Sequence, residues 1–312
     1  MAGTGIGIGQ VTTGSFPAGL KPYVDTWFGD FSLDKMQWSP MFEKFKDDQQ
    51  FVKDVLYSQF TTTNYKPEGS PTSYTSWQQQ WDVTYTHNAF SLGFMLTREA
   101  KDDVKYELNL VSQGMGFLKD AATRTYETLA ASVFLFGFDS DYLGGDGVPL
   151  YTASHPTADS NQSNILSTAA ALSETSLEDL LIQIGTAQDH MGNYIPIKGQ
   201  KLIIPPALRF EAERITGSVL RSDTANNDIN AMKALGMFPQ GTFENQYLSS
   251  APTAYYIITD AKNGLKYFDR TSPELSADKD FDTDGTKYKI YLRCSFGWTD
   301  WRSTYASQGV GE

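Results

Sequence analysis

The feature that most constrains this chain is the stretch from Thr97 to Gly137, which has helical periodicity. Its apolar residues recur mostly at steps of three and four, and they are Val104, Leu108, Val111, Met115, Leu118, Ala122, Leu129, Val133 and Phe136. Thr97 can cap the start and Gly137 can close the end. We predict one helix, or two nearly collinear helices, of about forty residues, which at 1.5 Å per residue is roughly 57 Å long.

A helix of that length is hard to place in a round protein. A compact chain of 312 residues has a radius of gyration of about 20 Å and hence a diameter of roughly 50 Å. Either the helix breaks at Gly114 and Gly116, where each glycine costs about 1 kcal/mol relative to Ala, or the protein is not a globule.

Bulk composition excludes several classes of protein. Hydrophobic residues make up 40% of the chain, which is enough for buried cores and excludes a disordered protein. The net charge is -12 and Lys and Arg do not cluster, which argues against a nucleic-acid-binding surface. No apolar run reaches eighteen residues and no signal-peptide pattern occurs, so we expect a soluble, intracellular chain with no membrane partner.

The segments before the long helix predict an arm, a helix and a hairpin. Residues 1–22 are rich in glycine and lack the G-x-G-x-x-G spacing, so they predict a flexible arm. Residues 40–56 predict an amphipathic helix with Pro40 at its first position. Residues 61–96 are polar, with a turn at 67–71 and a period-two pattern after it, so they predict a long two-stranded hairpin. An isolated hairpin is marginally stable, and no later segment is an obvious partner, so a neighbouring copy is expected to hold it.

The segments after the long helix predict a second unit and a return to strand. Residues 139–176 form a long irregular connection. An α/β unit then spans residues 177–262. Its predicted elements are a helix at 177–190 capped by Ser176, a strand at 201–204, helices at 207–216 and 228–235, and a strand at 254–259.

Residues 288–298 alternate strictly between apolar and other residues, which predicts a strand of roughly 36 Å. Such a strand can cover the long helix lengthwise, so we favour an elongated body in which the helix need not break. Gly114 and Gly116 then become a hypothetical bend.

No catalytic constellation is recognisable. The three histidines, His87, His155 and His190, lie in different segments without metal-ligand spacing, and His190 is interpreted as a favourable charge at a helix end. Cys294 is the only cysteine, so no internal disulfide is possible, and its place on the apolar face of a strand predicts a buried, inert thiol.

Asp280, Asp282 and Asp284 match the start of an EF-hand calcium loop. The twelfth position is Tyr291 rather than Glu, and strand rather than helix follows. We therefore favour a turn, with calcium binding as the alternative, and we predict no catalytic, cofactor or metal residues otherwise.

The order of these features resembles the major capsid proteins of tailed bacteriophages with the HK97 fold, closest to the Mu-like major head subunit group. The resemblance rests on a glycine-rich arm, a polar hairpin, a long helix opening at Thr97-Arg-Glu99 and a long C-terminal sheet. More specific are three short motifs. They are Asp146-Gly-Val-Pro-Leu-Tyr151-Thr-Ala-Ser-His155-Pro156 with Ser163-Asn164, Leu202-Ile-Ile-Pro205-Pro206, and Trp298-Thr-Asp300-Trp301-Arg302.

The resemblance implies an α+β, HK97-like capsid fold with a defined division of the chain. An N-terminal arm would span 1–35, a helical region leading into the peripheral P-domain 36–56, an E-loop hairpin 57–97, the spine helix and connecting loop 98–176, an axial A-domain 177–262, and the P-domain β-return 263–312.

The implied function is structural: self-assembly into an icosahedral virion shell that encloses double-stranded DNA without sequence-specific binding. The implied partners are the chain itself, in hexameric and pentameric capsomers, with separate scaffolding, portal and decoration proteins, and assembly in the host cytoplasm. Lys66 near the hairpin tip is interpreted as a solvated charge, with an intersubunit crosslink as the alternative. An encapsulin-type compartment shell of the same fold and a two-domain hydrolase remain as alternative functions.

Overall fold

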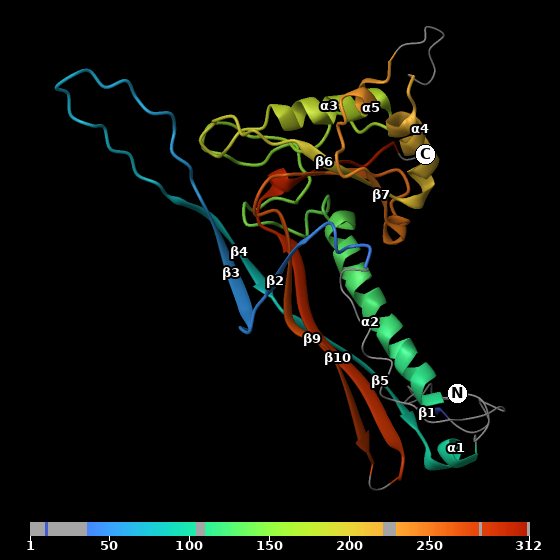
Figure 1. Cartoon of the computed structure of the whole chain (residues 1–312). Helices are drawn as coiled ribbons and strands as arrows, with labels where there is room; N and C mark the ends of the chain where they lie inside the picture. Colours follow the sequence, from blue (N-terminus) through green and yellow to red (C-terminus); the bar gives the residue numbers. More distant parts are fainter. Residues whose placement is uncertain (1–9, 12–35, 104–109, 221–228, 281–282, 311–312) are drawn as a thin grey trace, which may run out of the picture.

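The protein is elongated, as the pattern of a long helix and a long strand predicts. The computed structural model describes residues 10–11, 36–103, 110–220, 229–280 and 283–310. In Figure 1 the helix α2 runs beside the long strands β9 and β10, a hairpin arm of β3 and β4 projects from one side, and a second α/β unit lies at the upper end. Most of the predicted N-terminal arm lies outside the described residues.

A five-stranded sheet forms the long body, in the spatial order β1-β5-β10-β9-β2. Its strands are β1 (Gln10–Val11), β5 (Asn88–Leu96), β10 (Thr286–Trp298), β9 (Leu265–Lys279) and β2 (Glu43–Lys46). The central strand β10 is antiparallel to both β5 and β9. Its alternate residues Tyr288, Ile290, Leu292 and Cys294 are buried, which confirms the predicted period-two strand.

The long helical stretch forms two helices, α1 (Arg98–Asp103) and α2 (Leu110–Leu135). Thr97 caps α1, because its hydroxyl accepts a hydrogen bond from the amide of Ala100 at 3.3 Å. Residues 104–109 lie outside the described residues. Since α2 has 26 residues, it is about 39 Å long, and Figure 1 shows that α1 does not share its axis. The predicted single helix or pair of collinear helices, roughly 57 Å long, is therefore wrong. Helix α2 is shorter than predicted and α1 points in another direction, although α2 still runs along the sheet.

The two glycines in α2 do not interrupt it. The helix continues through Gly114 and Gly116, so neither is a break, and a bend at this point stays a prediction. Gly114 has a packing role instead: a Cβ atom there would lie 2.8 Å from Cε1 of Phe94, whose ring stacks on Tyr288 at 5.1 Å.

An aromatic cluster fills the space between α2 and the long sheet. Trp38 is fully buried, with its ring 4.6 Å from that of Tyr267 and 5.0 Å from that of Phe296. Glu127 of α2 fixes the segment that carries this tryptophan, because its carboxylate accepts hydrogen bonds from the amides of Gln37 at 2.5 Å and Trp38 at 3.2 Å. Burial raises the pKa of Glu127, although these two amides favour its charged form.

The helix predicted over 40–56 is wrong. This stretch contains β2, which pairs in parallel with β9, and β3 (Phe51–Tyr57), which pairs with β4 (Gln79–Thr86). The aromatic spacing reflects contacts across a sheet rather than around a helix, since Phe45 stacks on Phe268 of the neighbouring strand at 5.4 Å. Tertiary pairing here outweighs the local helical pattern.

The second unit is built on a four-stranded sheet in the order β11-β8-β6-β7. Its strands are β11 (Thr304–Ser307), β8 (Tyr255–Thr259), β6 (Gly199–Ile204) and β7 (Thr242–Glu244), and its helices are α3 (Glu174–Gly185), α4 (Arg209–Gly217) and α5 (Ala231–Ala234). Short 3-10 turns occupy Pro206–Leu208, Gln246–Leu248 and Trp301–Ser303. The strands predicted at 201–204 and 254–259 are confirmed as β6 and β8.

Two details of this unit differ from the sequence prediction. The N-cap of α3 is Ser173, whose hydroxyl accepts from the amide of Ser176 at 3.1 Å, so Ser176 is the third helical residue of a capping box and not the cap. The last strand, β11, pairs with β8, so the C-terminal segment contributes to both sheets. Within the described residues, no helix is both long and apolar enough to cross a membrane.

We expect Gly114→Ala to destabilise the protein, although alanine favours a helix by about 1 kcal/mol. The added methyl group overlaps the ring of Phe94, and overpacking of this kind costs about 1–3 kcal/mol. Urea denaturation of the unassembled chain measures the change. Gly185→Ala is the control, because a Cβ atom there meets nothing within 4 Å. A Gly114→Ala variant at least as stable as wild type would show that the ring moves away without cost.

Candidate functional site

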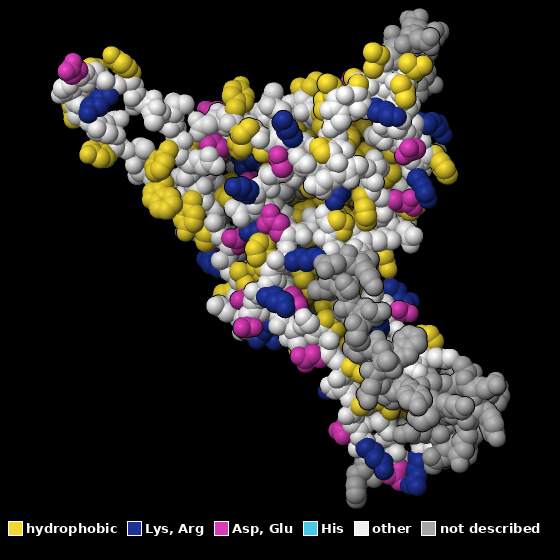
Figure 2. Space-filling view, viewed as in Figure 1, with side chains coloured by type: hydrophobic (Ala, Val, Ile, Leu, Met, Phe, Trp, Pro, Cys, Tyr) yellow, Lys and Arg dark blue, Asp and Glu magenta, His cyan; other side chains and the backbone are white. Residues whose placement is uncertain are grey.

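The projecting hairpin arm is the most exposed part of the described structure. Residues 58–78 between β3 and β4 contain no strand, and they carry aromatic side chains in contact with solvent (Figure 2). The exposed fraction is 91% for Tyr65, 95% for Tyr74 and 63% for Trp77. Large exposed apolar side chains on a projecting loop make it a candidate contact surface for another molecule.

The arm is attached firmly at its base. Asp54 of β3 accepts hydrogen bonds from the ammonium group of Lys266 in β9 and from the hydroxyl of Thr299 at 2.6 Å. The Thr299 hydroxyl also lies 2.7 Å from the Tyr85 hydroxyl, and its carbonyl accepts from Trp81 Nε1 at 3.2 Å. Both strands of the arm are thus tied to the C-terminal part of the chain.

The charges at this base are mutually dependent. Lys266 is only 5% exposed, so its ammonium group needs the Asp54 carboxylate as a partner. Burial alone would raise the pKa of Asp54, but the hydrogen bonds from Lys266 and Thr299 outweigh it, and the pKa lies below its usual value. No local sequence pattern predicts this pair, because 212 positions separate the two residues.

The prediction that no other segment of the chain pairs with residues 61–96 is wrong. The second half of this stretch forms β4 and then β5, and β5 pairs with β10 along nine residue pairs. The uncovered part is the outer loop alone, where an amide of Asn193 donates to the Phe60 carbonyl at 3.3 Å. Lys66 is exposed in this loop, and its interpretation as a solvated charge stays a prediction.

The connection 139–176 folds around a buried polar cluster. His155 is fully buried, with Nδ1 2.7 Å from Asp146 Oδ2 and Nε2 3.2 Å from Asn164 Oδ1, and its ring stacks on Trp301 at 4.1 Å. The Asn164 amide donates to the carbonyls of Leu150 at 2.6 Å and Thr304 at 3.2 Å. Both ring nitrogens of His155 are therefore engaged in holding the connection against the C-terminal segment. Two of the three motifs that carry the family resemblance meet at this point, the segment 146–164 and Trp301 of the segment 298–302.

The other two histidines are far from His155 in the sequence and have different surroundings. His87 is buried at the end of β4, with Nδ1 3.0 Å from the Ser295 hydroxyl and Nε2 3.4 Å from Asp47. His190 lies five residues beyond the end of α3 at Gly185, so its assignment as a helix-end charge is wrong. Burial and the nearby Arg302 guanidinium lower the pKa of His190, which favours its neutral form.

The remaining candidate site residues are Cys294 and the three aspartates of the possible calcium loop. Cys294 is buried, and burial raises the pKa of its thiol to about 12, which disfavours the reactive thiolate form. Asp280 pairs with Lys287 at 2.5 Å, and Asp284 pairs with Arg98 at 3.1 Å and Lys279 at 3.0 Å. Asp282 lies outside the described residues. Among those described, no group of three or more His, Cys, Asp or Glu side chains is placed to hold a metal ion.

Solved structures of similar fold include phage capsids and the capsid of a GTA particle. The capsid of a native GTA particle is similar with a TM-score of 0.58 and 12% identity, covering 94% of this chain and 96% of that chain. A structure of Mycobacterium phage Adephagia gives a TM-score of 0.54 and 11% identity over 87% and 88%. The capsid of Myoviridae phage XM1 gives 0.51 and 11% over 84% and 86%. The long sheet, the helix beside it, the projecting arm and the second α/β unit together define the HK97-like capsid fold.

Residues 82–307 match the family model described as phage capsid protein. The chain therefore belongs to the phage capsid protein family, and it is a major capsid shell protein. No curated protein sequence matches it. These matches do not favour the encapsulin or hydrolase alternatives.

We expect Asp54→Asn to lower the free energy of unfolding by about 3 kcal/mol at neutral pH, because it leaves the buried Lys266 ammonium without an ion-pair partner. The folded-state pKa of Asp54 is lowered from 3.8. Its contribution is therefore complete above that value and is lost as pH falls through the lower folded-state pKa. The stability difference between wild type and variant should shrink in acid, as urea denaturation at several pH values would measure.

Asp82→Asn is the matched control on the same arm. Asp82 pairs with Lys53 at 2.8 Å, but both side chains are more than a third exposed, so we expect a change below about 1 kcal/mol. Equal losses in the two variants would contradict the special role of the Asp54–Lys266 pair.

Proposed function

We propose that this chain forms the hexameric and pentameric capsomers of an icosahedral phage head, in which the arm of one subunit lies over its neighbour. The observation that carries the proposal is the outer loop at 58–78, with Tyr65, Tyr74 and Trp77 largely exposed on an arm whose base is fixed. A rigid base with an uncovered aromatic end suits a contact that only a second subunit completes. Many copies of a modest contact between subunits together stabilise such a shell.

The proposed domain organisation keeps the boundaries predicted from the sequence. They are an arm at 1–35, residues 36–56 leading into the P-domain, an E-loop at 57–97, a spine and connecting loop at 98–176, an A-domain at 177–262, and a β-return at 263–312. Separate scaffolding, portal and decoration proteins complete the proposed assembly, which takes place in the host cytoplasm. The protein acts without catalysis, a proposal supported by the structural engagement of His155 and the burial of Cys294.

The net charge and one sequence motif bear on what the shell encloses and on which subgroup the chain belongs to. The net charge of -12 suits a shell that encloses double-stranded DNA without binding it tightly. Membership of the Mu-like major head subunit group is supported by the motif from Asp146 to Asn164, because its polar residues form one buried cluster and would constrain one another.

Replacing Tyr65 and Tyr74 together by Ser should reduce the yield of shells at least tenfold without unfolding the subunit. Both side chains are more than 90% exposed, so their loss should change the stability of the free subunit by less than about 0.5 kcal/mol per site. Negative-stain microscopy and sedimentation measure the yield of shells, with any scaffolding partner present.

Lys66→Gln is the control, because it alters the same loop without removing an aromatic ring. Its shells should form normally. Wild-type shells dissolved in denaturant should run as single chains on gels, because Lys66 is interpreted as a solvated charge; a ladder would indicate an intersubunit crosslink. Undiminished assembly of the double Tyr→Ser variant would refute the proposed contact of the arm.

A further inference from the structure

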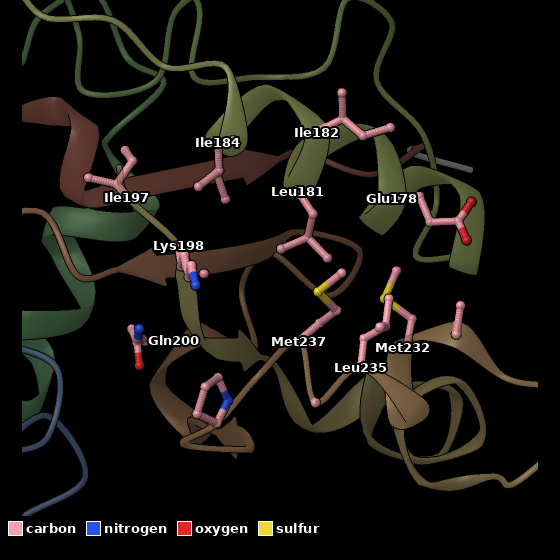
Figure 3. A pocket seen from close by; sticks show the side chains of 15 residues that line it. Glu178, Leu181, Ile182, Ile184, Ile197, Lys198, Gln200, Met232, Leu235 and Met237 are labelled. Atoms are coloured by element: carbon pink, nitrogen blue, oxygen red, sulfur yellow. The ribbon is translucent and has the colours of Figure 1, made fainter. Parts of the chain in front are cut away.

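An apolar pocket opens on the second unit, between α3 and the segment that contains α5. Its volume is about 650 Å³. Figure 3 shows Leu181 of α3 pointing toward Met237, with Met232 and Leu235 on the same side of the space as Met237. On its rims Ile182 is 64% exposed and Leu235 is 68% exposed. The described part of the chain leaves this apolar space open to solvent.

The same unit presents a second apolar group, formed by Val219, Leu220 and Ile229. Val219 is 70% exposed and Ile229 is 73% exposed, and Leu220 and Ile229 form a β-bridge. We call these three residues the apolar knob. They are aliphatic, as the pocket walls are, so each surface matches the other in chemistry.

A buried asparagine holds the knob in position. Asn230 is 2% exposed, and its amide donates to the carbonyls of Ile215 at 2.5 Å and Ser218 at 3.1 Å. Its backbone amide donates to the Val219 carbonyl at 3.2 Å. Because the backbone of the knob is already held, docking would not incur the further cost of ordering this backbone.

We propose that the knob of one subunit occupies the Leu181–Met237 pocket of the next copy around a capsomer. The inference rests on the proposed self-assembly and names the residues that make one of its contacts. The knob and the pocket are formed by different residues of one chain, so the proposed contact is heterologous, and a heterologous contact closes into a ring when the rotation between copies allows it.

The size of the contact fits a copy of this chain rather than an independent partner. A stable, specific interface buries about 1,200–2,000 Å² in total, far more than a few aliphatic side chains in one pocket. A contact with a second copy can bury a smaller area, because in the proposed shell the arm buries further surface between the same two subunits.

The pocket can be filled without disturbing the subunit. Gly185 lines the pocket at the end of α3, and a Cβ atom there meets nothing within 4 Å. Gly185→Leu places a large side chain in the pocket and also favours the helix, so the subunit should fold while capsomer formation falls at least tenfold by sedimentation. Gly185→Ala, which leaves most of the pocket open, is the matched control. Normal assembly of Gly185→Leu would overturn the proposal.

Cysteine crosslinking tests the pairing directly, because Cys294 is the only native cysteine and is buried. In assembled shells that carry both Val219→Cys and Leu235→Cys, mild oxidation should give a ladder of crosslinked chains that extends to pentamers and hexamers. A mixture of the two single variants should give dimers only. Each single variant alone should give none, since a heterologous contact does not bring a residue near its own copy.

The other outcomes are equally decisive. Crosslinked monomers would place the knob in the pocket of its own chain, and dimers from Val219→Cys alone would show a two-fold contact; either result overturns the inference. Intact shells without crosslinks overturn it and leave the proposed function standing. Failure of the wild-type chain to form shells would instead count against the proposed function itself.

Discussion

The packing of α2 along the long sheet is the interaction on which the rest of the structure depends. The contact is centred on Trp38, whose ring touches side chains from both the sheet and the helix. Loss of a buried tryptophan of this kind costs about 3–5 kcal/mol. Glu127 adds direction to this apolar contact, because its carboxylate holds the backbone at Gln37 and Trp38. The helix, the sheet and the segment leading into β2 are thereby fixed as one body.

From that body two features extend, and each is secured by polar groups. The arm is held by Asp54, Lys266 and Thr299, and the connection after α2 is held by His155, Asp146 and Asn164. Apolar packing alone would allow either feature to slide, whereas hydrogen bonds between buried groups permit one arrangement. Two of the exposed apolar surfaces, the outer loop of the arm and the apolar knob, are attached to backbone that hydrogen bonds hold in place.

The sequence predicts the long-range plan of this fold better than its local details. Strand β10 is predictable because one buried face imposes strict alternation over many residues. The segment 40–56 is not predictable in this way. Phe42 and Phe45 are three residues apart and Phe51 and Val55 are four apart, which is helical spacing, but their structure is decided by pairing with β9 and β4. Three further features could not be predicted from local sequence, because they form only when distant segments meet. They are the Asp54–Lys266 pair, the pocket and the knob. The resemblance to phage capsid proteins is confirmed at the level of the family and the fold, because it uses the order of segments, which does not depend on local secondary structure.

The short passage from β10 to β11 has a mechanical consequence. Strand β10 ends at Trp298 in the long sheet, and β11 begins at Thr304 in the other sheet. Thr299, within that passage, is also the residue that bonds to Asp54 and Tyr85 of the arm. A tilt of the second unit would therefore pull on the base of the arm, so the proposed capsomer contact and the proposed contact of the arm with a neighbour would be mechanically coupled within one subunit.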